Sequence, residues 1–377
     1  MRLENFIVSA RKYRPATFDT VVGQATITST LKNAIKNNHL AQAFLFCGPR
    51  GVGKTTCARI LAKTINCFNL QENIEACDQC ESCKSFNEGQ SLNIFELDAA
   101  SNNSVDNIRE LTEKVRFLPQ IGTKSVYIID EVHMLSTAAF NAFLKTLEEP
   151  PKHAIFILAT TEKHKIIPTI LSRCQIFDFQ RIGIKDISDH LLNVATKENI
   201  TAEPDALHVI AQKADGGLRD ALSIFDQIVS FTGNNISYQS VIENLNVLDY
   251  DYYFRVTDAA YTQNISSGLL IFDEILRKGF DGHHFILGLA AHCRNILVCK
   301  DAATVKLLEV GENIREQYLS QANTISTEFL LKALEICSKT DIEFRSAKNP
   351  RLLLELAIIQ ICSINYQHSS QQESKKK

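Results

Sequence analysis

The chain has 377 residues and a formal net charge of −3, and this length predicts about two or three domains rather than one hydrophobic core. The near-neutral charge excludes a uniformly basic protein that coats nucleic acid, so that any DNA contact must be local. No run of about 18 apolar residues occurs, and Met1 to Arg14 lacks the apolar centre of a secretion signal, so we expect a cytoplasmic protein without a membrane span.

The first motif along the chain is Gly-Pro-Arg-Gly-Val-Gly-Lys-Thr at residues 48–55, which matches G-x-x-x-x-G-K-[ST]. The apolar run 43–47 before it predicts a buried strand. The apolar residues after it, at 57, 60, 61 and 65, fall at helical spacing. The motif therefore has the strand, loop and helix context of a site that binds the phosphates of a nucleoside triphosphate.

The residue types of this loop fit that chemistry. Glycines at 48, 51 and 53 let the backbone N–H groups approach a phosphate closely. Lys54 adds a positive charge against the β- and γ-phosphates, and Thr55 offers its hydroxyl to Mg²⁺. The nucleotide-binding residues predicted in this loop are Gly48, Pro49, Arg50, Gly51, Val52, Gly53, Lys54, Thr55 and Thr56.

Four of the eleven cysteines form a pattern, with Cys67 followed by Cys77, Cys80 and Cys83. Such spacing lets four thiolates converge on one tetrahedral ion, and a closed set of four sulfurs predicts structural rather than catalytic zinc. An iron–sulfur cluster would use the same ligands, and reduced surface cysteines are the other alternative. The remaining cysteines lie in apolar segments and are interpreted as core residues: Cys47, Cys57, Cys174, Cys293, Cys299, Cys337 and Cys362.

Strand and helix signals alternate in the first half of the chain. Short β-rich runs at 94–98, 125–130 and 154–159 enclose amphipathic helical patterns at 105–115 and from Ser136 to Pro150. This alternation predicts an α/β fold with a parallel sheet. From about Ile182 the strand signals stop, and helical patterns continue to about Ile364.

The apolar run from Tyr127 to Glu131 predicts a strand that ends in two carboxylates, Asp130 and Glu131. With a phosphate-binding loop upstream, Asp130 is predicted to hold Mg²⁺ through water and Glu131 to activate the attacking water. Thr160 and Thr161 end the neighbouring strand, where a threonine hydroxyl could reach the same water.

These motifs together resemble the clamp-loader ATPases of the AAA+ class, and specifically the bacterial DNA polymerase III gamma/tau family. The resemblance covers the chain almost continuously from 11 to about 230, and beyond 240 it rests on helical character alone. The matching stretches are RKYRP at 11–15 with Phe18, VVGQ at 21–24, the loop at 48–55, the four cysteines, ELDAAS at 96–101, DEVHML at 130–135, LKTLEEPP at 144–151, LATT at 158–161, SRC at 172–174 and GLRDAL at 217–222.

The resemblance implies roles that a single chain cannot reveal. Arg173 is similar to the arginine finger that reaches the γ-phosphate bound by an adjacent subunit, and Arg219 to the sensor that reports ATP to a helical lid in cis. Thr161 is similar to the first sensor, with Thr160 as its rival. Val21 and Val22 are expected to line the adenine pocket, and the implied cofactors are ATP, Mg²⁺ and Zn²⁺.

The resemblance also implies a domain order. We expect an AAA+ domain at 1–181 with its zinc module at 67–83, a helical lid at 182–243, a helical collar domain for oligomerisation at 244–364 and a disordered tail at 365–377. The tau-type proteins of the family continue into a region that binds the helicase and the polymerase. Since this sequence ends at Lys377, a gamma-length or truncated product is expected.

The implied function is that of an ATP hydrolase within the DNA polymerase III holoenzyme, separate from the polymerase active site, which opens the sliding clamp and loads it onto primed DNA. The implied partners are subunits of the delta and delta-prime type in a hetero-pentamer, copies of the chain itself, the sliding clamp and primer-template DNA, in the bacterial replisome. A branch-migration motor, a scaffold that does not hydrolyse ATP and a zinc-finger DNA reader are the alternatives. The scaffold is disfavoured because this chain keeps the residues predicted to bind and hydrolyse ATP, namely Lys54, Thr55, Asp130 and Glu131.

Overall fold

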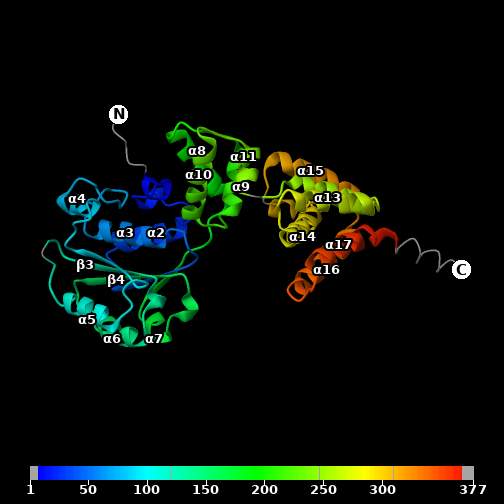
Figure 1. Cartoon of the computed structure of the whole chain (residues 1–377). Coiled ribbons are helices and arrows are strands. Elements are labelled where there is room, and N and C mark those ends of the chain that lie inside the picture. The colour runs from blue at the N-terminus through cyan, green and yellow to red at the C-terminus, as the bar shows by residue number, and fades with distance from the viewer. Residues whose placement is uncertain (1–6, 120, 246, 309, 367–377) are drawn as a thin grey trace. The chain divides into compact units, whose positions relative to one another are not determined.

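The computed structural model in Figure 1 describes residues 7–119, 121–245, 247–308 and 310–366. The chain forms two compact units. The first comprises the residues up to Ala202 together with Ile210–Asn235, and the second comprises Glu203–Val209 together with the residues from Ile236 onward. The predicted boundaries at 181 and 243 stay a prediction. Of the predicted disordered tail at 365–377, Asn365 is ordered and donates to the carbonyl of Tyr261 at 3.0 Å, and the part from 367 onward lies outside the described residues.

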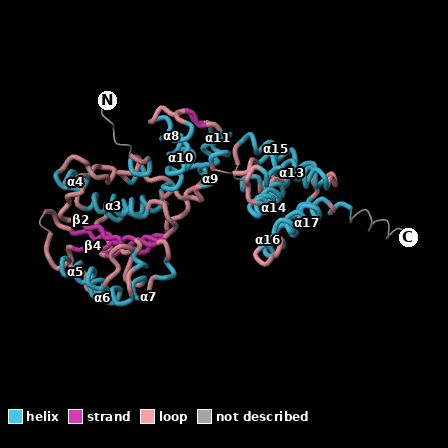
Figure 2. Tube along the Cα trace, in the orientation of Figure 1, coloured by secondary structure: helices cyan, strands magenta, loops and turns pink. Residues whose placement is uncertain are grey.

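A parallel sheet of five strands forms the centre of the first unit, drawn in magenta in Figure 2. Its pairs β2–β3, β3–β4, β4–β1 and β1–β5 are all parallel, which confirms the predicted sheet. In spatial order the strands are β2 (Ile94–Asp98), β3 (Ser125–Asp130), β4 (Ala154–Thr160), β1 (Ala43–Cys47) and β5 (Gln175–Asp178).

The central strands are buried on both faces because their side chains alternate between two apolar cores. In β1, Phe44 and Phe46 enter one core, and Leu45 and Cys47 enter the other. Figure 1 shows a layer of helices over each face of the sheet. The helices on the side of Phe44 are α2 (Ala25–Lys36) and α3 (Lys54–Ile65), and those on the side of Leu45 are α5 (Val105–Lys114) and α6 (Thr137–Glu148).

The caps of the helices agree with the sequence. The side chain of Ser136 accepts a hydrogen bond from the backbone N–H of Ala139 at 3.2 Å and so begins α6 as predicted. Ser104 caps α5 in the same way through Asn107 at 3.3 Å. The remaining short elements of the first 180 residues are α1 (Ser9–Lys12), η1 (Phe18–Thr20), α4 (Glu81–Asn87), η2 (Val132–Met134), η3 (Lys163–Lys165) and α7 (Pro168–Leu171).

From residue 182 the described chain is almost entirely helical, as predicted. The exception is a small sheet of two two-residue strands, β6 (Thr201–Ala202) and β7 (Asn235–Ile236), which are too short to produce a period-two pattern in the sequence. The first helices of this region are α8 (Ile184–Lys197), α9 (Pro204–Lys213), α10 (Leu218–Thr232) and α11 (Tyr238–Asn244).

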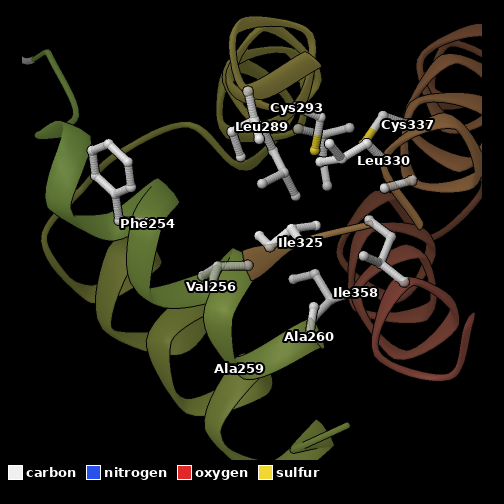
Figure 3. Close-up of a cluster of buried hydrophobic side chains, with 14 of the residues drawn as sticks. Phe254, Val256, Ala259, Ala260, Leu289, Cys293, Ile325, Leu330, Cys337 and Ile358 are labelled. Atoms are coloured by element: carbon white, nitrogen blue, oxygen red, sulfur yellow. The ribbon is translucent and has the colours of Figure 1, made fainter. Parts of the chain in front are cut away.

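The second unit has its own apolar core, part of which Figure 3 shows. Leu289, Ile325 and Ile358 come from distant parts of the sequence and share this core, together with the predicted core cysteines Cys293 and Cys337. Within the described residues, none of the helices combines the length and the hydropathy that a membrane span needs. The elements here are α12 (Tyr250–Tyr261), α13 (Ile265–Arg277), α14 (Gly282–Val298), η4 (Val305–Leu307), α15 (Glu312–Thr324), α16 (Thr327–Phe344) and α17 (Pro350–Cys362).

Candidate nucleotide and metal sites

The predicted catalytic segments meet at one edge of the sheet. The loop 48–55 follows β1, Asp130 ends β3, and Thr161 follows β4, which lies between the other two strands. Because parallel strands all end at the same edge, these segments converge although up to 113 positions separate them, as from Gly48 to Thr161. Open α/β sheets bind their ligands at this carboxyl edge.

The glycines of the loop adopt backbone conformations that other residues rarely reach. The φ angles are 145° at Gly48, 78° at Gly51 and 101° at Gly53. A Cβ atom at Gly48 would lie only 2.4 Å from the carbonyl oxygen of Phe179. The close turn that leads into α3 therefore requires glycine, which agrees with the phosphate-loop interpretation.

Lys54 is the first residue of α3, and its ammonium group lies inside the loop. Its Nζ donates to the carbonyl oxygens of Gly48 at 2.8 Å and Pro49 at 2.7 Å. Burial lowers the pKa of Lys54, while Glu131 and Asp130 act in the opposite direction. A positive charge is thus held beside the backbone N–H groups on which the phosphates are predicted to lie.

Thr55 and Asp130, the two predicted magnesium ligands, contact each other. The hydroxyl of Thr55 donates to Oδ2 of Asp130 at 2.7 Å, and Oδ1 of Asp130 accepts the backbone N–H of Glu131 at 2.9 Å. A hydroxyl beside a carboxylate offers the oxygen ligands that Mg²⁺ prefers, with the rest supplied by water and phosphate. The residues present therefore fit a magnesium ion.

Glu131 is held in place by the end of β4. Its Oε2 accepts the hydroxyl of Thr161 at 3.0 Å and the backbone N–H of Thr161 at 3.1 Å. The neighbouring Thr160 points elsewhere, since its hydroxyl lies 3.0 Å from Nδ1 of His133 and accepts the N–H of Glu162. Of the two threonines considered from the sequence, the structure brings Thr161 to the carboxylate.

A cavity of about 730 Å³ lies over the loop. An apolar part of its wall consists of Val21, Val22, Ile182 and Leu222, as an adenine pocket requires. The cavity volume is in the range of small-molecule sites. A second cavity of about 620 Å³ is lined by Gly48, Pro49 and Thr161. The other predicted residues that line the larger cavity are Arg50, Gly51, Val52, Gly53, Lys54, Thr55, Thr56, Asp130, Glu131 and Arg219.

Four arginines line the larger cavity, at positions 11, 14, 50 and 219. Arg219 lies at the start of α10, where its backbone N–H donates to the carbonyl of Gly51 at 3.4 Å. Arg14 is not among the site residues predicted from the sequence, yet its Nε donates to the hydroxyl of Thr56 at 3.2 Å. Burial, followed by the positive charge of Arg59, lowers the pKa of Arg14. Its place in the matching stretch RKYRP was the only signal in the sequence.

Arg173 is not among the residues that line either cavity. Its guanidinium donates to the carbonyl of Thr169 at 2.8 Å and to the carboxylate of Glu148 at 2.8 Å. The side chain is 33% exposed, so it is accessible from outside the chain. The structure therefore does not bring Arg173 to the other predicted catalytic residues of its own chain.

The four predicted cysteine ligands form one cluster, with all Sγ atoms of Cys67, Cys77, Cys80 and Cys83 within 4.8 Å of one another. Four thiolates about 2.3 Å from a central Zn²⁺ give comparable spacings. Backbone hydrogen bonds from Gln79 and Cys80 lower the pKa of Cys77 to about 6, which favours the thiolate form that a metal needs. None of the described cysteines forms a disulfide, and the cluster fits zinc.

Three protein families match successive parts of the chain. They are described as DNA polymerase III, delta subunit, at residues 23–183; DNA polymerase III clamp loader subunit, ATPase lid domain, at 186–234; and DNA polymerase III subunits gamma and tau domain III, at 236–376.

Curated relatives extend this similarity. The Buchnera aphidicola DNA polymerase III subunit gamma is 33% identical over 96% of this chain and 98% of its own length. The Bacillus subtilis subunit tau is 40% identical over 96% of this chain, and the Escherichia coli subunit tau is 40% identical over 74% of it. This chain spans 64% and 43% of the length of those two tau proteins.

The solved Thermotoga maritima RuvB Holliday junction branch migration motor aligns with a TM-score of 0.47 and 19% identity, over 66% of this chain and 78% of that one. This similarity is too low to bear on function.

Proposed function

Because this chain belongs to the gamma and tau family of DNA polymerase III clamp-loader subunits, we propose that it binds and hydrolyses ATP to drive the loading of a sliding clamp onto primed DNA. The observation that carries the ATPase proposal is the convergence of Lys54, the Thr55–Asp130 pair and the Glu131–Thr161 pair at one edge of the sheet. Each of these groups has a defined task in phosphoryl transfer.

In this proposal the loop 48–55 binds the phosphates and Lys54 offsets their charge. Thr55 and Asp130 hold Mg²⁺, which when bound neutralises negative charge on the phosphates. Glu131 orients the attacking water and accepts its proton, and Thr161 fixes the carboxylate of Glu131 in that position. Val21 and Val22 contact the adenine ring.

Arg173 and Arg219 complete the proposed site from two directions. Arg219 lines the cavity of its own chain and acts as the sensor in cis. Arg173 reaches the γ-phosphate bound by a neighbouring subunit, a role that its exposure and its absence from the lining of the two described cavities support. Turnover then requires an assembly, because a single chain lacks one catalytic group.

The proposed assembly is a hetero-pentamer that contains copies of this chain and subunits of the delta and delta-prime type. It contacts the sliding clamp and primer-template DNA in the cytoplasmic replisome. The proposed zinc ion at Cys67, Cys77, Cys80 and Cys83 is structural, because four protein sulfurs leave no open position for a substrate.

The test is reconstitution with delta-type and delta-prime-type subunits, a sliding clamp and primed DNA. We expect ATP-dependent transfer of the clamp to DNA, and ATP turnover that rises when both clamp and primed DNA are present. A matched assembly that contains Lys54→Ala should transfer no clamp. Equal transfer by the native and Lys54→Ala assemblies would rule out the proposed function.

A further inference from the structure

The four-cysteine cluster is connected to the nucleotide cavity through the buried residue Glu75. Glu75 lies in the loop between Cys67 and Cys77 and is only 3% exposed. Its carboxylate accepts the backbone N–H groups of Phe18 at 3.0 Å and Asp19 at 3.1 Å. One acidic side chain of the cysteine loop thus binds a segment more than fifty residues earlier in the sequence.

The charge of Glu75 is matched by its surroundings. Phe18 and Asp19 begin the 3-10 helix η1, whose first N–H groups have no partner within the helix and favour a negative charge. The ammonium of Lys32 lies 2.8 Å from the same carboxylate. Removing the charge would turn one of the two accepting oxygens into a donor and leave at least one of these N–H groups without an acceptor, which is costly in a protein interior.

The cysteine loop determines where this carboxylate lies. The carbonyl oxygen of Glu75 accepts the N–H of Gln71 at 3.0 Å. Its neighbour Ile74 has a φ of 62°, which is unusual for a β-branched residue and persists only where the surrounding structure holds it. The predicted metal ligand Cys77 lies only two residues after Glu75. Order around the four sulfurs therefore fixes the position of Glu75.

The segment that Glu75 binds carries the apolar wall of the cavity. At its other end Gln24, which is 3% exposed, donates to the carbonyl of Gln180 at 2.7 Å. The residues 18–24 are thus held at both ends. Val21 and Val22 lie between the two anchors and line the larger cavity.

We propose that Glu75 is a positioning residue through which the four-cysteine cluster holds the wall of the nucleotide cavity, so that metal occupancy of the cluster sets nucleotide affinity. This proposal rests on the proposed function, because it takes the cavity to be the nucleotide site. It assigns the cluster a task in nucleotide binding without placing any cysteine at the phosphates.

The test measures the affinity of the full chain for N-methylanthraniloyl-labelled ATP. Glu75→Gln should bind about ten-fold more weakly, which corresponds to about 1.4 kcal/mol, because the segment 18–24 loses the charged contact that holds one of its ends. The control is Glu72→Gln, which makes the same charge change at an exposed position of the same loop and should bind like the native chain.

Removal of zinc from the native chain by a chelator, which is then dialysed away before Mg²⁺ is restored, should weaken binding to a similar extent. Chelation of Glu75→Gln should add little, because two changes that act through one contact are not additive. Hydrogen exchange gives a readout that does not depend on the nucleotide: the amides of Phe18 and Asp19 should exchange faster in Glu75→Gln and in the chelated native chain.

Unchanged affinity of the chelated native chain overturns the proposal even if Glu75→Gln folds poorly. Equal affinities of native chain and Glu75→Gln, or additive effects of chelation and substitution, also overturn it. If the proposed function is wrong, the result is different: the native, metal-loaded chain then shows no saturable nucleotide binding.

Discussion

The hydroxyl and the backbone N–H of Thr161 both donate to the same carboxylate oxygen of Glu131, at 3.0 and 3.1 Å. Glu131 itself has a left-handed backbone with a φ of 46°, directly after β3. A residue in this conformation needs its surroundings to hold it, and Thr161 supplies two of the contacts that do so. The proposed general base is therefore oriented by the neighbouring strand.

This contact predicts that Thr161→Ala lowers ATP turnover by a reconstituted assembly about ten-fold or more, because a misplaced general base loses part of a contribution of 10²–10⁴. Nucleotide affinity should stay close to native, since Thr161 contacts Glu131 rather than the phosphate loop. Thr161→Ser keeps the hydroxyl and should retain most turnover. Native turnover by Thr161→Ala would show that the contact has no catalytic role.

Lys54→Ala and Glu131→Gln should separate binding from hydrolysis. Lys54→Ala removes the positive charge inside the loop and should abolish tight ATP binding. Glu131→Gln leaves the Thr55–Asp130 pair intact, so it should bind ATP and lose hydrolysis. Equilibrium binding and turnover of both variants in the same assembly check this. Hydrolysis at the native rate by both would refute the assignment of the site.

The cysteine cluster should hold one zinc ion per chain. Zinc in a closed thiolate site contributes on the order of 10 kcal/mol to local folding, so its removal should loosen residues 67–83 while the sheet, built from other segments, stays folded. Elemental analysis of protein purified without chelator gives the metal content. Absence of zinc together with four freely titratable thiols at these positions would contradict the assignment.

The second unit should lose stability in mildly acidic solution because of His292. This side chain is 1% exposed, and its ring nitrogens lie 2.9 Å from the hydroxyl of Tyr318 and 2.9 Å from Oε1 of Gln321. Burial lowers the pKa of His292 from 6.5 to about 4, against an opposing effect of the Gln321 hydrogen bond. At a pH between about 4 and 6.5, His292 binds a proton in the unfolded chain and does not in the folded chain.

Stability from this depressed pKa is therefore complete above about pH 6.5 and falls as the pH drops towards about 4. The expected loss of unfolding free energy from pH 7.5 to pH 5 is about 2 kcal/mol. Urea unfolding at both pH values measures it, with His292→Gln as the control that removes the titrating group. Equal pH dependence in the native chain and the variant would exclude His292 as the cause.

The central sheet could be predicted because its inner strands are continuous apolar runs. β1, β3 and β4 are buried on both faces, so each appears in the sequence as a short block of Val, Ile, Leu and Phe. The edge strand β5 was not predicted. It has four residues, and Gln175, Ile176 and Asp178 are exposed, so its pattern does not differ from that of a loop.

The loop, the two carboxylates and the four cysteines could be identified because each set is local in the sequence. Residues that act through distant contacts could not. Glu75 and Glu72 are both acidic residues of one polar loop, and only the fold buries Glu75 against Phe18 and Asp19. Arg14 likewise enters the cavity through a hydrogen bond to Thr56 that no spacing rule predicts.

We propose that each nucleotide site is completed by Arg173 of a neighbouring subunit. A trans-acting arginine finger contributes roughly 10³ to 10⁵ in rate, and lysine replaces it poorly because a planar fork becomes a point charge. Arg173→Ala should therefore leave the nucleotide affinity of the isolated chain nearly unchanged and suppress turnover by the assembly.

The most direct test mixes Arg173→Ala chains with Lys54→Ala chains, each of which should be inactive when assembled alone. In a mixed assembly an intact loop of the first variant can face an intact finger of the second across one interface. We expect ATP hydrolysis to return and to be greatest at intermediate mixing ratios. No recovery of hydrolysis at any ratio, with co-assembly verified, would contradict the role of Arg173 in trans. Arg173 would then act within its own chain or have only a structural role.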